Sequence, residues 1–497
     1  MTFQGEVLIR DGQSASSLFW NLLKCATDAF PEAFLAFRLP DDAAAFKRDY
    51  PALLTQFERC RIASLRSTEI ATFLARESLN QLMFRSTQGD VTLMQHLASS
   101  NQTLTLQASE PQAFSPWHPS IPFACTLWTA SDIVSLAALL KSQHWLSEEA
   151  AQTLSLIGQG IAAEGIDLRG HRIAILGASA EMAPTAYFLR AGADILWVDQ
   201  RPPPLAWQKG AFPGRLHWAA TPTDLLTHPE AALAAVKAFA EEGAVHLGLF
   251  AYAPGAMREF KLTGVMNAIV DAMPPNALAS VGMLVSPTTP TRLGASDQAA
   301  SDAWWTSRPW WMTALRALGL LKPQSSLQGP HPVSDSVVTI QGASYQAAQY
   351  LGKTLMAETW EAERVARLQA QPPSGGTPST SEAKEAVSLT EGTGFRVSAN
   401  TAPITQTRSL AHPVFAAAFQ GARTLGVETF LPEFSQQVGG LLWMHDWMRS
   451  ESNSAIRQRV HGGIHPMPYQ LQSALYVAAA IGFARRPLLL KGLFDRS

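Results

Sequence analysis

The stretch from Arg172 to Gln200, RIAILGASAEMAPTAYFLRAGADILWVDQ, decides which fold class the chain belongs to. It contains two short apolar runs, RIAILG and DILWVD, and the residues between them become helical in pattern after Pro184. Two strands joined by a helix run parallel, because the connection has to cross back over the sheet. Gly177 follows the first strand and Asp199 ends the second, an arrangement typical of a nucleotide-binding unit.

The same alternation of strand and helix patterns continues along the chain. Helical patterns cover 228–243 and 258–273, and apolar strand patterns cover 245–255 and 277–287. After an interruption, VVTIQGASYQAAQYLGKTLMAETWEAERVARLQ returns to strand and then helix, and FRVSANTAPI is the last strand. This order predicts an α/β fold with a doubly wound, Rossmann-type parallel sheet.

We expect the chain to divide into three parts. Residues 1–168 form an N-terminal domain of unknown role, 169–410 form the Rossmann-type domain, and 411–497 form a helical extension on the substrate side. Insertions interrupt the middle part at about 289–336, where four tryptophans gather, and at about 366–393. The tryptophan-rich insertion is expected to pack against the N-terminal part, to close over an apolar substrate, or to join copies into a homo-oligomer.

Composition and charge restrict the class of protein. The 497 residues include 38 basic and 40 acidic side chains, which gives no electrostatic reason to expect nucleic acid as a partner. No uncharged apolar run approaches the roughly 18 residues of a membrane-spanning helix, so no transmembrane segment is expected. The beginning of the chain lacks the pattern of a signal peptide. The three cysteines, Cys25, Cys60 and Cys125, have no metal-binding spacing and are interpreted as buried thiols of a cytoplasmic protein.

The order of these pieces, from Arg172 to about Ala411, resembles the short-chain dehydrogenase/reductase family. The segment at 223–255 is similar to the family's run from an acid that contacts adenine to a strand ending in Asn-Asn-Ala-Gly, where only Gly255 matches. LVSPTTP stands where the strand of the catalytic serine ends, and FRVSANTAPITQT resembles the segment that holds the nicotinamide. The resemblance implies an enzyme that uses NAD(P)H to reduce a carbonyl, such as a 3-oxoacyl group, of an apolar or acyl small-molecule substrate.

The resemblance and the positions at strand ends also assign the cofactor contacts. These residues are Gly177, Ser179, Asp199, Arg201, Asp224, Ala253, Gly255, Pro403 and Thr405. Asp199 is expected to take the ribose hydroxyls of NAD, whereas Arg201 would pair with the 2′-phosphate of NADP, and the balance leans slightly to NAD. Glu181 replaces a family glycine. It is either a first-turn acid of a helix that holds no phosphate, or it points outward while Ser179 and backbone N–H groups hold the phosphate.

The family's chemistry needs a tyrosine as proton donor, a serine that orients the carbonyl and a lysine cation. Most members place the lysine four residues after the tyrosine, and here Gln349 follows Tyr345 at that spacing. The ketoreductase domains of polyketide and animal-type fatty-acid synthases instead carry the lysine on the preceding helix, where this chain has Lys261. Similarity to these domains implies a catalytic set of Tyr345, Ser286, Lys261 and Gln349.

Other registers of the tyrosine helix stay open. A shift by four residues places Gln341 and Tyr345 at the tyrosine and lysine positions, which would make the site inactive, and Tyr350 with Lys353 is a third choice. Enoyl reductases separate tyrosine and lysine by seven residues, a spacing that Tyr345 and Lys353 miss by one. An inactive site would leave a reductase-like binding or assembly subunit, which is the alternative function.

Two histidines, His461 and His465, occur in the motif HGGIHPMPY. Its glycines and proline predict a loop, and no third ligand at a suitable spacing accompanies the pair. We therefore expect this loop to line the substrate pocket and expect no metal site.

Overall fold

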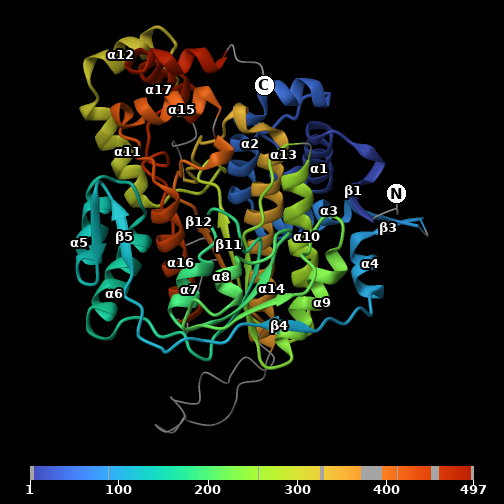
Figure 1. Cartoon of the computed structure of the whole chain (residues 1–497). Helices are drawn as coiled ribbons and strands as arrows, with labels where there is room; N and C mark the ends of the chain where they lie inside the picture. Colours follow the sequence, from blue (N-terminus) through green and yellow to red (C-terminus); the bar gives the residue numbers. More distant parts are fainter. Residues whose placement is uncertain are drawn as a thin grey trace.

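A seven-stranded sheet forms the centre of the computed structural model, which describes residues 5–87, 89–255, 257–324, 330–370, 394–410, 412–448 and 458–493. The strand order is β12-β11-β10-β7-β8-β9-β4 (Figure 1). The strands are β4 (Leu106–Ala108), β7 (Arg172–Leu176), β8 (Asp194–Val198), β9 (Leu216–Ala219), β10 (Val245–Leu249), β11 (Leu278–Val285) and β12 (Arg396–Thr401). All neighbours run parallel except β4 with β9, so the prediction of an α/β fold with a largely parallel sheet is confirmed.

Side chains of the central strands are buried on both faces of the sheet. In β7, Ile173 and Ile175 belong to one hydrophobic cluster, whereas Ala174 and Leu176 belong to another. Successive residues of a strand point to opposite faces, so both faces of this strand are covered. This explains why β7 appears in the sequence as a continuous apolar run instead of an alternating one.

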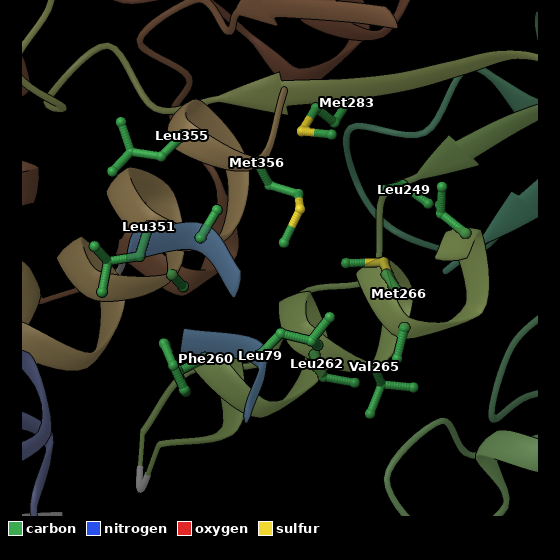
Figure 2. Packing of buried hydrophobic residues seen from close by; sticks show 14 of the residues in the cluster. Leu79, Leu249, Phe260, Leu262, Val265, Met266, Met283, Leu351, Leu355 and Met356 are labelled. Atoms are coloured by element: carbon green, nitrogen blue, oxygen red, sulfur yellow. The ribbon is translucent and has the colours of Figure 1, made fainter. Parts of the chain in front are cut away.

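One face of the sheet packs against helices that follow β9, β10 and β11 in the chain. They are α9 (Pro229–Ala240), α10 (Arg258–Asp271), α13 (Gly342–Ala347), the π-helix η5 (Ala348–Leu355) and α14 (Met356–Ala370). Figure 2 shows Leu249 of β10 and Met283 of β11 beside Met266 of α10 and Met356 of α14. These four side chains are buried, so the helix that carries Tyr345 is joined to the centre of the sheet by apolar packing.

Helix α16 (Pro432–Met448) covers the opposite face of the sheet. The indole of Trp443 lies directly over Gly248 of β10 and Gly282 of β11. A Cβ atom at Gly248 would be 2.8 Å from that ring, and one at Gly282 would collide with it. Both glycines are therefore needed for α16 to approach the sheet this closely.

The first 168 residues have no separate hydrophobic core within the described part of the chain. Their helices share the two clusters that cover the sheet, and β4 extends the sheet at its edge. The helices are α1 (Ala15–Ala29), α2 (Ala43–Ala63), α3 (Ser67–Asn80), α4 (Leu93–Ser99), α5 (Asp132–Ser142) and α6 (Glu148–Glu164). The expected N-terminal domain is thus built into the unit that contains the sheet, because its apolar faces find their partners there.

A third hydrophobic cluster contains no residue of the central sheet. It is built from the tryptophan-rich insertion and the C-terminal helices, which lie together at the upper left of Figure 1. The helices are α11 (Ala295–Ser307), α12 (Trp310–Ala317), α15 (Pro413–Gly421) and α17 (Leu471–Arg485). Met312 is buried there and Trp311 packs partly against the cluster, whereas Trp310 is 82% exposed. The insertion therefore packs mainly on the C-terminal helices, which corrects the expected packing against the N-terminal part.

Smaller sheets and short helices complete the chain. They are β1 (Glu6–Ile9), β2 (Leu82–Ser86), β3 (Gly89–Thr92), β5 (Ser120–Phe123), β6 (Thr126–Thr129), α7 (Thr185–Arg190), α8 (Leu205–Gln208), η4 (Thr339–Gln341), η8 (Ala422–Leu425) and η9 (Pro487–Leu493). None of the helices described has the length and apolarity needed to cross a membrane.

Two expectations about local structure are wrong. The segment VVTI forms no strand and ends in the short helix η4, and the strand that pairs with β11 on this side of the sheet is β12. Cys25 and Cys125 are exposed, so they are not the buried thiols expected from the sequence. The part of the 366–393 insertion after residue 370 lies outside the described residues.

Candidate active site

Gly177 ends β7 with a φ of 84°, a conformation that favours glycine. A Cβ atom there would collide with the backbone of Ala251, which follows β10. The Gly177 N–H donates to the Val198 carbonyl at the end of β8. This glycine therefore lets three neighbouring strands end close together, at the edge of the sheet where parallel α/β proteins bind ligands.

Ser179 and Asp199 are brought together, and each is the other's partner. The backbone N–H and the hydroxyl of Ser179 donate to Asp199 Oδ2 at 2.9 and 2.8 Å. The backbone N–H of Arg201 donates to Asp199 Oδ1 at 3.1 Å. A carboxylate offers about four acceptor positions, so one remains for a ribose hydroxyl. The Arg201 side chain is exposed beside it.

Glu181 holds the loop after β7 against the C-terminal part of the chain. Its Oε2 accepts a hydrogen bond from the Arg408 backbone N–H at 3.1 Å, and its carbonyl accepts one from Gln436 Nε2 at 2.7 Å. Because the Ser179 hydroxyl is bonded to Asp199, only backbone N–H groups remain to bind a phosphate. Those of Glu181 and Met182 donate to nothing among the described residues.

The other residues predicted to contact the cofactor lie at strand ends but mostly have protein partners. Asp224 Oδ1 accepts from the Leu226 N–H at 2.9 Å in the turn after β9. The Thr405 hydroxyl donates to the Pro403 carbonyl at 2.9 Å and lies 2.5 Å from the Ser435 hydroxyl of α16. Gly255 has a φ of 81° and open space at its Cβ position, so it leaves room at the end of β10.

Ser286 and Tyr345 meet at the carboxyl end of β11, as predicted. Their side chains lie next to each other, and the ring of Tyr252 meets that of Tyr345 edge-on with 6.4 Å between centroids. The Ser286 hydroxyl lies 2.7 Å from the Thr288 hydroxyl. Burial raises the pKa of Tyr345, although the nearby Ser286 hydroxyl opposes this shift. The phenol therefore stays protonated at neutral pH and is suited to donate a proton or a hydrogen bond, not to act as a base.

A chain of buried polar groups leads away from this pair. Gln349 Oε1 accepts from the backbone N–H of Ser286 at 2.9 Å, and Gln349 Nε2 donates to Glu259 Oε1 at 3.3 Å. The Ala253 N–H donates to the other oxygen of Glu259 at 3.2 Å. Gln349 thus lies beside Ser286 and connects the serine strand to a carboxylate on α10.

The lysine of this chain of groups is Lys353, not Lys261. Lys353 Nζ lies 3.8 Å from Glu259 Oε1 and donates to the Leu284 carbonyl of β11 at 3.2 Å. Burial raises the pKa of Glu259 and lowers that of Lys353, and the attraction between the two opposes both shifts. Lys261 instead faces Glu6, with 3.6 Å between Nζ and Oε1. The structure does not bring Lys261 to the tyrosine.

The π-helix η5 explains why Lys353 fits although its spacing from Tyr345 is eight residues. A π-helix closes its hydrogen bonds over five residues instead of four, so it takes up one extra residue within a helix. The same helix uses Tyr350 elsewhere, since its hydroxyl donates to Glu58 at 2.6 Å. Gln341, the other register considered, accepts from the Thr288 hydroxyl at 2.7 Å. The sign of this π-helix in the sequence is the spacing of eight residues between Tyr345 and Lys353, one more than the seven of enoyl reductases.

The two histidines of the HGGIHPMPY loop are fully buried and stacked, with 4.6 Å between ring centroids. His465 Nε2 lies 3.0 Å from the carbonyl of Pro287, the residue after Ser286. In the part of the chain that the structure describes, no three His, Cys, Asp or Glu side chains gather as a metal site would require. The loop therefore packs against the segment that follows β11, next to Ser286.

Comparison with known proteins adds no relative. No family model matches the chain, and no curated protein matches it either. The arrangement of Ser286, Tyr345, Gln349, Glu259 and Lys353 is therefore the basis for assigning a function.

Proposed function

We propose that the protein is an oxidoreductase of short-chain-reductase type, with a doubly wound Rossmann-type sheet, that reduces a carbonyl with NAD(P)H. One observation carries the proposal: the hydroxyl groups of Ser286 and Tyr345 lie close together at the carboxyl end of β11. A buried glutamine, carboxylate and lysine support them from behind. The substrate class is an apolar or acyl carbonyl compound of 3-oxoacyl type.

In this proposal each side chain has one task. The Ser286 hydroxyl binds the carbonyl oxygen of the substrate, and Tyr345 transfers its phenolic proton to that oxygen as the alcohol forms. Gln349 fixes the backbone at Ser286, and Glu259 and Lys353 fix Gln349. Because burial raises its pKa, Tyr345 keeps its proton until reaction, which favours reduction over oxidation.

The residues around the β7 loop are compatible with a dinucleotide. Asp199 retains an acceptor position for a ribose hydroxyl, and the N–H groups of Glu181 and Met182 are available to a phosphate. The first N–H groups of a helix, here those of Thr185 and Ala186, also lack partners within it. Bound NAD(P)H would supply the hydride.

The direct test is turnover. Purified protein is mixed with NADH or NADPH and with acetoacetyl-coenzyme A or a long-chain 3-oxoacyl thioester, and loss of the reduced nicotinamide is followed by absorbance. Nucleotide oxidation that depends on the thioester and is lost in Tyr345→Phe is the expected result. Oxidation that Tyr345→Phe leaves unchanged would reject Tyr345 as the proton donor.

A second candidate function follows from the mutual engagement of Ser179 and Asp199. Groups that already satisfy each other have less to gain from a ligand. In this case the protein is a reductase-like subunit that binds no dinucleotide and acts in assembly. Binding of NADH or NADPH separates the two candidates without knowledge of the substrate.

A further inference from the structure

A pocket of about 480 Å³ lies between the β5–β6 turn, the end of α5 and the helices of the third cluster. Phe123, Trp145 and Trp304 supply aromatic walls, and the remaining apolar lining comes from small residues and Leu139. No lining residue belongs to the Ser286 and Tyr345 group. The volume is in the range of pockets that hold small molecules.

The walls of this pocket are joined by hydrogen bonds. The Gly462 N–H donates to the Trp145 carbonyl at 2.7 Å, and the Gly462 carbonyl accepts from the Glu428 N–H at 2.8 Å. Trp145 Nε1 donates to the Gly426 carbonyl at 3.0 Å. A pocket whose walls are already connected in this way needs little ordering when a ligand binds.

Two glycines keep the pocket open. A Cβ atom at Gly463 would be 2.8 Å from the Gly426 carbonyl, and one at Gly426 would be 2.9 Å from the ring of Trp304. Both glycines also have positive φ angles, 94° and 74°, which other residues rarely adopt. Any side chain at either position would narrow the pocket or displace its walls.

Two lining residues other than glycine also have unfavourable backbone conformations. Ala124 has a φ of 51° and His144 a φ of 53°. Ala124 and Cys125 form the two-residue turn of the β5–β6 hairpin, where Asn-Gly is the usual choice. Such conformations cost free energy and gather at ligand sites when the surrounding structure enforces them.

The polar part of the lining is basic or neutral. Arg423 Nε donates to Glu428 Oε2 at 2.8 Å, and this carboxylate is buried. The Arg423 side chain is 66% exposed, and the two terminal nitrogens of its guanidinium donate to nothing in the described residues, so a ligand can reach them. Gln143 and His144 are the other polar lining residues, and the lining includes no acid.

We infer that this pocket binds a small, flat, apolar or aromatic molecule that carries one anionic group. The aromatic walls hold the apolar body, and the free edge of the Arg423 guanidinium binds a carboxylate, phosphate or sulfonate. The pocket is separated from Ser286 by the loop 461–466, because Gly463 and Pro466 line it while His465 contacts Pro287. The inference does not depend on the proposed reductase activity.

Two fluorescent probes test the inference on the full chain. Anilinonaphthalene sulfonate has an aromatic body and one negative charge, and phenylnaphthylamine has a closely similar body without the charge. We expect the sulfonate to bind saturably, and Arg423→Gln to weaken it by about tenfold, the loss of one charge-assisted hydrogen bond, while phenylnaphthylamine binding stays the same. Arg316→Gln is the matched control, because Arg316 stacks on Trp305 outside the pocket, and it should change neither probe.

Filling the pocket should weaken both probes. Ala300→Trp places a large ring in the lining, and Gln143→Trp does so from an exposed position, where we expect little effect on folding. Melting temperatures identify any variant that fails to fold. Probe binding that survives Gln143→Trp in a folded protein would overturn the inference. Equal weakening of both probes by Arg423→Gln would overturn the assignment of an anion.

Discussion

Two groups of polar side chains lie at the same edge of the sheet, and they differ in how far their hydrogen bonds extend. Around Asp199, the partners are Ser179 and Arg201, which come from two adjoining strand ends. Around Glu259, the partners come from β10, η5 and, through Gln349, from β11. Both carboxylates are buried, but the first is satisfied by local N–H and O–H donors, whereas the second also relies on the cation of Lys353.

This difference indicates which of the two carboxylate sites contributes more to the stability of the fold. A carboxylate held by N–H and O–H donors of two adjoining loops contributes no buried ion pair, so a change at this site should affect stability less. A buried carboxylate paired with a lysine ties three elements together, and removal of either charge leaves the other without compensation. The Tyr345 group is therefore expected to be rigid and the Asp199 group adaptable.

The largest effect is expected for Lys353→Met. This change leaves Glu259 buried without its counter-charge and should lower the free energy of unfolding by about 3–5 kcal/mol. Denaturation by urea, followed by circular dichroism, measures the loss. Lys261→Met is the matched control: its partner Glu6 is half exposed, so the loss should be below about 1 kcal/mol. If Lys261→Met abolished turnover while Lys353→Met preserved it, the ketoreductase-like arrangement would be correct instead.

Tyr345→Phe should remove about two decades of turnover or more, because only the transferred proton is lost. Nucleotide affinity should remain nearly unchanged, which stopped-flow and binding measurements on the same preparation can separate. Tyr350→Phe is the control on the same helix. It removes a hydrogen bond to Glu58 and should affect stability without a comparable effect on turnover.

The pH dependence of turnover tests whether Tyr345 is the protonated group that reduction requires. Burial raises the pKa of this phenol, so the protonated form that reduction requires persists through and above neutral pH. We expect reduction to show no loss on the alkaline side until beyond the ordinary tyrosine pKa of about 10. An alkaline inflection near neutral pH that disappears in Tyr345→Phe would contradict this environment.

A smaller effect is expected at the Asp199 group. Asp199→Ala should weaken the binding of NADH by about 1–3 kcal/mol, the range for loss of hydrogen bonds to a charged group. The remaining acceptor position of Asp199 should also favour NADH over NADPH. Asp194→Ala is the control, since that carboxylate lies at the other end of β8, 3.8 Å from Arg172. Equal losses in the two variants would show that Asp199 acts only through the fold.

The smallest effect is expected for Glu181→Gln. Its negative charge beside the loop after β7 opposes an anionic ligand, so neutralisation should tighten dinucleotide binding by about 0.3–1 kcal/mol at low salt. The amide oxygen can still accept the hydrogen bond from Arg408. Weaker binding in Glu181→Gln would mean that the carboxylate itself contributes to the cofactor site.

The sheet could be predicted because its strands are buried on both faces. Strands such as β7 and β8 appear as uninterrupted apolar runs separated by helical patterns, and this is visible without any knowledge of distant contacts. The place of the first 168 residues could not be predicted in the same way. Their apolar faces show that they need partners, but sequence patterns do not show that α1–α3 and α10 share one cluster.

The candidate site also has residues that could be predicted from the sequence and residues that could not. Ser286, Tyr345 and Gln349 could be grouped from the sequence, and they lie together in the structure, because strand ends and helix spacing are local properties. Lys353 was displaced from its expected spacing by the π-helix, and Lys261 faces Glu6 because the N-terminal strand β1 lies beside α10. Neither a change in helix type nor the position of a distant strand can be inferred from spacing alone.

Binding of the reduced dinucleotide tests the central claim most directly. Purified protein is titrated with NADH and with NADPH, and binding is followed by nicotinamide fluorescence. We expect saturable binding, tighter for NADH, that is weakened in Asp199→Ala and unchanged in Tyr345→Phe. No saturable binding of either nucleotide at millimolar concentration would contradict the reductase proposal and leave the assembly subunit as the better description.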